Sequence, residues 1–168
     1  MIAENNYEYK EMANPVLTGW YKVCITKITE PTETHSGNAT GFWIQMDVWV
    51  DDRTLQRSVW LSFDHPSDFV TRKSTNICAM LRQMFPAVTN DAGYIDKLFW
   101  LLFKTYEDKN GKEKEQFFDS KHHVSLDGKT TLYGDVIEEE NEQPRRMREK
   151  VYSNGNGATD NDGSDVPF

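Results

Sequence analysis

Residues 41–63, GFWIQMDVWVDDRTLQRSVWLSF, contain two runs in which apolar and polar side chains alternate, separated by Asp51-Asp52. Successive side chains of a β-strand point to opposite faces, so each run has one buried and one exposed parity. The pattern predicts two strands, 41–50 and 55–63, joined by a tight turn. The side chains expected to face the core are Phe42, Ile44, Met46, Val48, Val50, Leu55, Val59, Leu61 and Phe63.

The flanking sequence adds three more strands and one helix. Residues 19–28 are rich in β-branched and aromatic residues, which favours a strand. Residues 74–84 carry apolar side chains at helical spacing and end before Pro86. Residues 97–106 and 114–119 flank Asn110-Gly111, a strong hairpin signal. Five strands with one helix between strands 3 and 4 is the element order of an OB-fold, so we expect a mainly β, OB-fold-like five-stranded barrel.

Charge and composition divide the chain into four parts. We expect an N-terminal extension (1–14), an OB-like domain (15–132), a charged connector (133–152) and a disordered acidic C-terminal tail (153–168). Residues 1–132 have a net charge of -3, whereas residues 153–168 contain three Asp and no Lys or Arg. The tail reads SNGNGATDNDGSDVPF, a composition typical of flexible linkers that ends in an apolar tip.

Four of the five tryptophans lie on the strand parity opposite to the aliphatic core, among Lys, Gln, Ser and Thr. Exposed rings interleaved with cations suit single-stranded nucleic acid, because bases stack on the rings and cations neutralise phosphate. We therefore expect a binding surface for single-stranded DNA, whereas Trp100 lies in an apolar run and is expected in the core. The predicted surface consists of Trp20, Lys22, Trp43, Trp49, Arg57, Trp60, Lys104, Lys112 and Lys114.

The same tryptophans also fit a second function. A Trp-rich face is found at protein interfaces as well, so a protein-interaction or structural assembly module is the alternative. Polar neighbours such as Gln45, Asp47 and Ser58 are unfavourable in a dry interface, and they favour the nucleic-acid interpretation.

The last nine residues, DNDGSDVPF, resemble the acidic tip of bacterial single-stranded DNA-binding proteins, which ends in Asp residues, an aliphatic residue, Pro and a terminal Phe. Asn161, Gly163 and Ser164 dilute the acidic run of that family. The strand opening at residues 19–21, the 41–63 hairpin and the helix resemble phage-encoded proteins with the same type of fold. The resemblance implies roles in DNA replication, recombination and repair, with partner proteins of these processes bound through Asp162, Asp165, Val166, Pro167 and Phe168.

The tail also offers a second role by charge. Without DNA, its three Asp carboxylates are able to occupy the groove that phosphate would fill, and DNA would then displace the tail and free it for partners.

No catalytic motif stands out, so we expect a binding protein rather than an enzyme, with no cofactor and no metal. Four His and two distant Cys lack zinc-site spacing, and there is no phosphate-binding glycine loop. Glu107-Asp108-Lys109 resembles the end of a strand in metal-dependent nucleases. These residues lie at the predicted hairpin turn, which explains them without a catalytic role, so a metal-dependent nuclease is only the third candidate.

The expected location is the cytoplasm, that of the bacterial host if the protein is phage-encoded. Cys24 and Cys78 are predicted to be free thiols, as in a reducing compartment. The longest apolar stretch, residues 98–103, is too short for a membrane span, so we expect no membrane association. The sequence does not indicate whether DNA or RNA is preferred. It also leaves the oligomeric state open, and a homo-oligomer is one of the possibilities.

Overall fold

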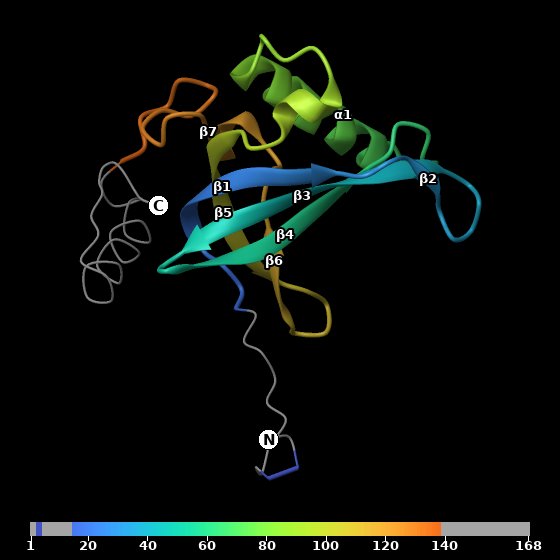
Figure 1. The fold of residues 1–168 in the computed structure, drawn as a ribbon, viewed down its shortest axis with the longest axis horizontal. Coiled ribbons are helices and arrows are strands. Elements are labelled where there is room, and N and C mark those ends of the chain that lie inside the picture. Colours follow the sequence, from blue (N-terminus) through green and yellow to red (C-terminus); the bar gives the residue numbers. More distant parts are fainter. Residues whose placement is uncertain (1–2, 5–14, 139–168) are drawn as a thin grey trace.

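The computed structural model describes residues 3–4 and 15–138, which form a curled antiparallel sheet and one α-helix (Figure 1). The predicted order of three strands, a helix and two strands is confirmed for the longer elements, and the fold is OB-like. The elements are β1 (Gly19–Ile28), β2 (Thr32–Glu33), β3 (Thr40–Val50), β4 (Arg53–Leu61), α1 (Asp68–Met84), η1 (Asp91–Tyr94), β5 (Leu98–Glu107), β6 (Glu113–Gln116), η2 (Lys121–His123) and β7 (Val124–Ser125).

The β3–β4 hairpin is the longest ladder of the sheet. Val50 pairs with Arg53, so Asp51 and Asp52 alone form the turn. Asp51 has φ 58°, a left-handed conformation that Asp tolerates better than bulkier residues. The register pairs Ile44 with Val59, which places the aliphatic side chains of both strands on one face.

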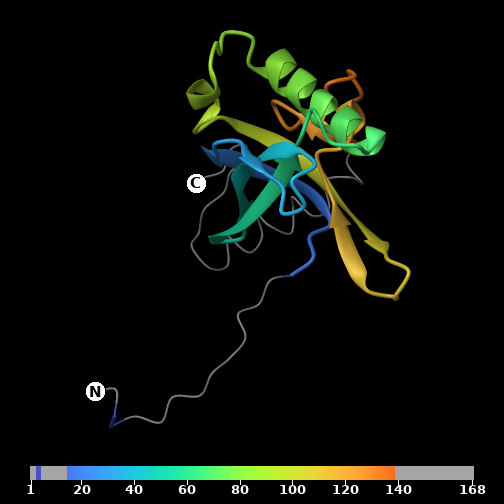
Figure 2. The ribbon, with the colours of Figure 1, turned by 90° about the vertical axis from the view of Figure 1, so that its right-hand side faces the viewer.

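The sheet curls into a half-barrel that stays open between β4 and β6. Strands follow the order β2-β3-β1-β5-β6, with β4 on the other side of β3 and β7 on β5. Within the described residues no ladder joins β4 to β6. In Figure 2 the β5–β6 hairpin extends away from α1 and from the body of the domain.

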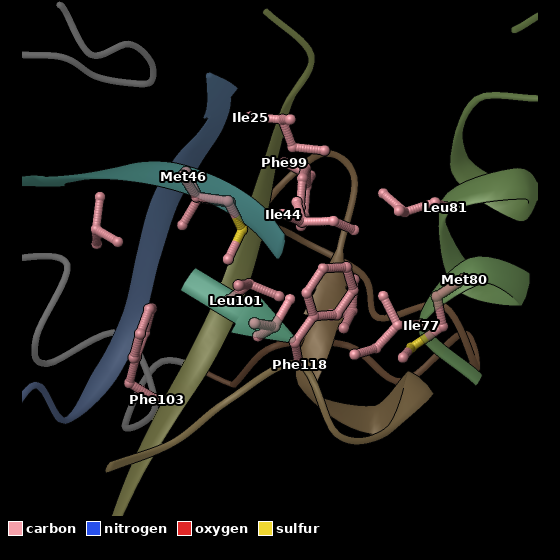
Figure 3. Packing of buried hydrophobic residues seen from close by; sticks show 14 of the residues in the cluster. Ile25, Ile44, Met46, Ile77, Met80, Leu81, Phe99, Leu101, Phe103 and Phe118 are labelled. Atoms are coloured by element: carbon pink, nitrogen blue, oxygen red, sulfur yellow. The ribbon is translucent and has the colours of Figure 1, made fainter. Parts of the chain in front are cut away.

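The core lies between the inner face of the curled sheet and α1 (Figure 3). From the sheet, side chains of β1, β3 and β5 are fully buried, and α1 adds an apolar stripe at helical spacing. The core includes Ile25, Ile44, Met46, Ile77, Met80, Leu81, Phe99, Leu101, Phe103 and Phe118.

The helix begins six residues earlier than residue 74, where the sequence pattern placed its start. In residues 68–74 of the helix, Ser74 is the one buried side chain. This part of the helix therefore lacks the apolar residues at helical spacing that indicated the rest of it. The Ser74 hydroxyl donates to the Val70 carbonyl (2.8 Å) and accepts from the Ser62 amide (2.9 Å). This side chain fixes the first half of α1 to the end of β4.

One ion pair connects the two edges of the opening. Arg57 of β4 lies across from the buried Met46, and so its side chain points to the inner face. Its guanidinium binds both carboxylate oxygens of Glu115 in β6, at 2.8 and 2.9 Å. Both side chains are only 12% exposed. Glu115 also accepts from the Leu17 amide (2.7 Å), and Arg57 donates to the Pro15 carbonyl (2.7 Å).

Two expectations about core residues are wrong. Phe63 is 54% exposed, because β4 ends at Leu61 and the chain leaves the sheet before it. Trp100 is half-buried outside the core cluster, on the face of β5 opposite Phe99 and Leu101. Its indole lies against the backbone of Gly128, where a Cβ would be 2.8 Å from the ring.

The folded part continues past residue 132. Thr130 and Val136 form a β-bridge, the Ile137 amide donates to the Lys129 carbonyl (2.9 Å), and Ile137 is 8% exposed. The start of the segment expected as a charged connector is thus packed on the domain. The rest of that connector and the C-terminal tail lie outside the described residues.

No helix in the described part of the chain has the length and apolar character that crossing a bilayer requires.

We predict that Glu115→Ala lowers the free energy of unfolding by about 2–4 kcal/mol, because it removes the carboxylate that binds the Arg57 guanidinium and the Leu17 amide in a nearly dry site. Urea denaturation measures this loss. Arg72→Gln is the matched control, since Arg72 pairs with Asp68 at the surface and its removal should cost under about 0.5 kcal/mol. Equal stability of Glu115→Ala and the wild type would contradict the role given to this pair.

Candidate nucleic-acid interface

The β3–β4 hairpin presents a polar, aromatic surface on the side away from the core. We name this surface the outer face; the ladder pairs its residues directly across the two strands. Trp43 lies opposite Trp60 at one end, and Trp49 lies opposite Thr54 at the other. Polar side chains fill the space between the tryptophans. The outer face consists of Trp43, Gln45, Asp47, Trp49, Thr54, Gln56, Ser58 and Trp60.

Trp43 is the most exposed tryptophan of this surface, with 46% of its area accessible. Its neighbour Trp60 is half-buried because its indole lies against the backbone of Gly41. A Cβ at Gly41 would be 2.2 Å from the Trp60 ring, so only glycine permits this approach. His65 contacts the same ring edge-on, at 5.8 Å between centroids. Trp60 is therefore held in one orientation beside a freely accessible Trp43.

Trp49 is accompanied by a cation. The Lys22 ammonium of β1 lies over the Trp49 ring, 5.3 Å from its centroid. Such a contact contributes about 0.5–1 kcal/mol at a partly exposed site. The structure thus brings together Lys22 and Trp49, two members of the predicted surface, and places a positive charge next to an aromatic ring.

Two predicted contact residues are not exposed. Trp20 is 3% exposed, so the expectation of an accessible ring at the start of β1 is wrong. Arg57 is the second, because its guanidinium is bound by Glu115 and only 12% of its side chain is accessible. Arg57 serves the closure of the half-barrel and is not a free phosphate partner.

The remaining predicted cations lie on the β5–β6 hairpin. Lys104 pairs with Gln116 and Lys114 with Tyr106, which puts these four side chains on one face of the hairpin. Lys112 follows in the turn, where the Asp108 carboxylate accepts from its amide (2.9 Å). All three lysines are exposed. They flank the opening of the half-barrel, opposite β4.

A groove of about 510 Å³ lies in that opening, between the edge of β4, the first turns of α1 and the β5–β6 hairpin. Phe69 is 73% exposed and Tyr106 49%, and both line the groove together with Trp60 and Lys73. Sequence analysis missed Phe69 and Lys73 because they precede the recognisable helical pattern. For Tyr106 the sequence did contain a signal: it has the same strand parity as Lys104, which indicates an exposed side chain.

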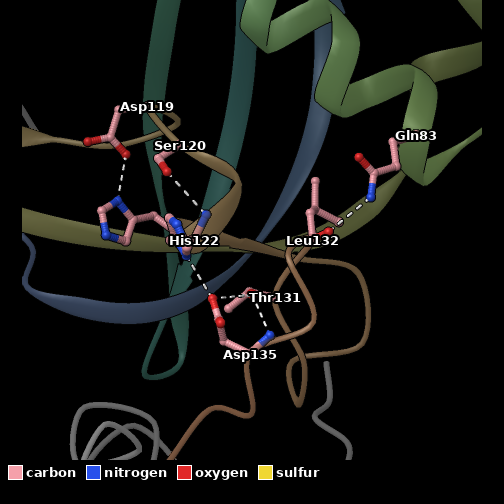
Figure 4. Close-up of polar contacts among 8 residues, drawn as sticks. Gln83, Asp119, Ser120, His122, Thr131, Leu132 and Asp135 are labelled. Carbon is pink, nitrogen blue, oxygen red and sulfur yellow. Dashed lines mark hydrogen bonds and ion pairs between the residues drawn. The ribbon is translucent and has the colours of Figure 1, made fainter.

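A second polar cluster lies near the C-terminal end of the domain (Figure 4). His122 Nδ1 is 2.7 Å from Asp135 Oδ2, and His123 Nδ1 is 2.9 Å from Asp119 Oδ1. Hydrogen bonds from His122 and then Thr131 hold the pKa of Asp135 below its ordinary value. In the described residues no group of His, Cys, Asp and Glu is arranged to hold a metal ion. These contacts fasten residues 131–135 to the domain.

The two cysteines are free and half-buried. Burial, and then nearby carboxylates, raise the pKa of both Cys24 and Cys78, so their thiols are protonated at neutral pH.

The chain matches no protein-family model and no curated protein at a significant level, so the functional argument depends on the chemistry of these surfaces.

We predict that Gly41→Ala displaces the Trp60 ring and lowers the free energy of unfolding by about 1–3 kcal/mol through overpacking. In a Trp60→Ala background the same substitution should cost much less, since the obstructing ring is gone. Urea denaturation of the four proteins in this double-mutant cycle measures the coupling. An equal cost in both backgrounds would show that Gly41 is required for another reason.

Proposed function

We propose that the protein binds single-stranded DNA without sequence preference through the outer face of the β3–β4 hairpin. The observation that carries this proposal is the exposed Trp43 beside the fixed Trp60, on a strand face that is otherwise polar. Each base stacked on such a ring contributes about 1–3 kcal/mol, and every base offers a π-face. Stacking on these rings gives affinity for every base, which fits binding without sequence preference.

Base stacking should contribute more to the binding free energy than phosphate neutralisation does. Residues 1–132 have a net charge of -3, and the cations nearest to the rings are few, with Lys22 at Trp49 the clearest. For single strands, log Kd changes with log salt in proportion to the phosphates neutralised, with about 0.7 per contact. Two to four contacts give a slope of magnitude about 1–3, which is shallow for a nucleic-acid-binding protein.

The second part of the proposal concerns the C-terminal tip, which lies outside the described residues. Its support is the resemblance of Asp162, Asp165, Val166, Pro167 and Phe168 to the partner-binding tip of bacterial single-stranded DNA-binding proteins. A terminal Phe offers a ring and a carboxylate to one basic, apolar pocket on a partner. The partners proposed are proteins of DNA replication, recombination and repair.

The alternative function is an assembly interface with another protein chain, and the exposed aromatic residues are the observation that favours it. Trp43 and Phe63 would both gain from burial against a second chain. Size-exclusion chromatography with light scattering separates the two functions. A monomer that binds oligo-dT supports the proposal, whereas an oligomer that Trp43→Ala dissociates and that oligo-dT does not affect supports the alternative.

We predict that oligo-dT quenches tryptophan fluorescence and that Trp43→Ala weakens binding about 5- to 100-fold, the equivalent of one lost stack. Tyr133→Ala is the matched control: Tyr133 is 61% exposed but lies beyond β7, and its loss should change affinity less than twofold. Fluorescence titration measures both. Equal quenching by a duplex of the same length would show that the assignment to single strands is wrong.

Removing residues 165–168 should leave the affinity for oligo-dT equal or higher at low salt, because the tail is a tethered acidic competitor for the DNA surface. Replacing Asp160, Asp162 and Asp165 by Asn in the full-length chain isolates the effect of charge from that of length. Fluorescence anisotropy at two salt concentrations measures the difference. A large loss of DNA affinity in either variant would contradict the role proposed for the tail.

A further inference from the structure

The groove between β4 and β6 joins the outer face but was not part of the surface that the sequence indicated. Trp60 belongs to both: it is paired with Trp43 on the hairpin and it lines the groove. A strand lying on the outer face therefore reaches the groove without a gap. The inference below rests on the proposed function and specifies a further contact of the same strand.

The groove has a closed end and an open end. At the closed end, the Arg57–Glu115 pair and the Pro15 and Leu17 backbone groups connect the two walls. Above this end the groove contains about 510 Å³, a volume within the roughly 300–1,000 Å³ of small-ligand pockets. It is therefore deep enough for one planar group and its attachment.

Four aromatic side chains line this space: Phe117, half-buried just after β6, and three that come from three other elements. Phe69 extends from the first turn of α1, Trp60 from β4, and Tyr106 from β5. Phe69 leaves 73% of its area in water, so most of its ring is available to a ligand. The rings offer stacking surfaces of the kind that bases occupy in single-strand-binding proteins.

The electrostatic balance of the groove favours an anion. Glu115 lines the groove, but Arg57 already neutralises its carboxylate. Lys73, one turn after Phe69, has no carboxylate partner within the described residues. Ser58 and Gln116 add neutral polar groups on the two walls. An aromatic groove with one uncompensated cation suits a base with its phosphate.

An extended peptide is less suited to the same space. A peptide strand would have to pair with the free edge of β4, but only residues 58–60 of that edge line the groove. Next to them, Arg57 is bound to Pro15 and Glu115. Three residues give too short a ladder for strand addition, since strands in proteins have about five or six residues.

We propose that the groove holds one nucleotide of the bound single strand, with its base stacked on Phe69 or Tyr106 and its phosphate at Lys73. The strand then crosses the edge of β4 at Trp60 and continues along the outer face past Trp43. The protein would contact a longer stretch of DNA than the outer face alone allows.

The test measures the affinity of Phe69→Ala, Tyr106→Ala and Lys73→Gln for fluorescently labelled oligo-dT, with circular dichroism to show that each variant folds. Phe69→Ala should weaken binding about 5- to 100-fold, and Lys73→Gln should weaken it and reduce the magnitude of the salt slope by about 0.7. Tyr133→Ala again serves as the exposed aromatic control. An oligonucleotide that carries 5-iododeoxyuridine should crosslink under ultraviolet light to peptides containing Phe69, Trp60 or Tyr106.

The outcomes separate the two proposals. If Trp43→Ala weakens binding while all three groove variants stay within twofold of the wild type, the groove proposal is overturned and the proposed function stands. Crosslinks to Trp43 and Trp49 peptides alone would overturn it in the same way. If the wild type does not bind oligo-dT, the proposed function itself fails. A dimer that Phe69→Ala dissociates, with unchanged DNA affinity, would assign the groove to a second copy of the chain and overturn the proposal.

Discussion

The contact between Arg57 and Glu115 holds together the two edges at which the curled sheet is open. An OB-like sheet needs its two outermost long strands to approach each other, and here no backbone ladder joins β4 to β6 in the described residues. A single bidentate ion pair, only 12% exposed on either side, connects them and also binds the backbone at Pro15 and Leu17. Arg57 and Glu115 connect β4 and β6 at one point, and the groove lies beside this point, between β4 and the β5–β6 hairpin.

The strand pattern of residues 41–63 was sufficient to predict the β3–β4 hairpin and the outer face, because strict alternation leaves one solution for the parity of each side chain. Arg57 shows where this reasoning ends. It occupies a core parity, and the residue that accepts its charge lies 58 positions away, a distance that no local pattern encodes. Trp20 has the parity of an exposed side chain but is buried, because parity gives the side of the sheet and not what covers that side.

The groove was hidden for a related reason. Phe69 and Lys73 lie in turns of α1 that extend beyond the core, where a helix lacks the apolar spacing by which it is recognised. Tyr106 and Trp60 belong to strands that are not neighbours in the sheet. Bringing these side chains together is a property of the closed fold, so only the three-dimensional arrangement could reveal it. By contrast, the Lys22–Trp49 contact follows from the adjacency of β1 and β3 and was within reach of the sequence.

The hydroxyl of Ser74 has a mechanical consequence for this arrangement. By bonding both the Val70 carbonyl and the Ser62 amide, it ties the first half of α1 to the residue that follows β4. The β5–β6 hairpin forms the opposite wall of the groove, and the Arg57–Glu115 pair links the two walls. One wall is thus tied to the helix by a hydroxyl group, whereas the other belongs to a hairpin that extends away from the helix.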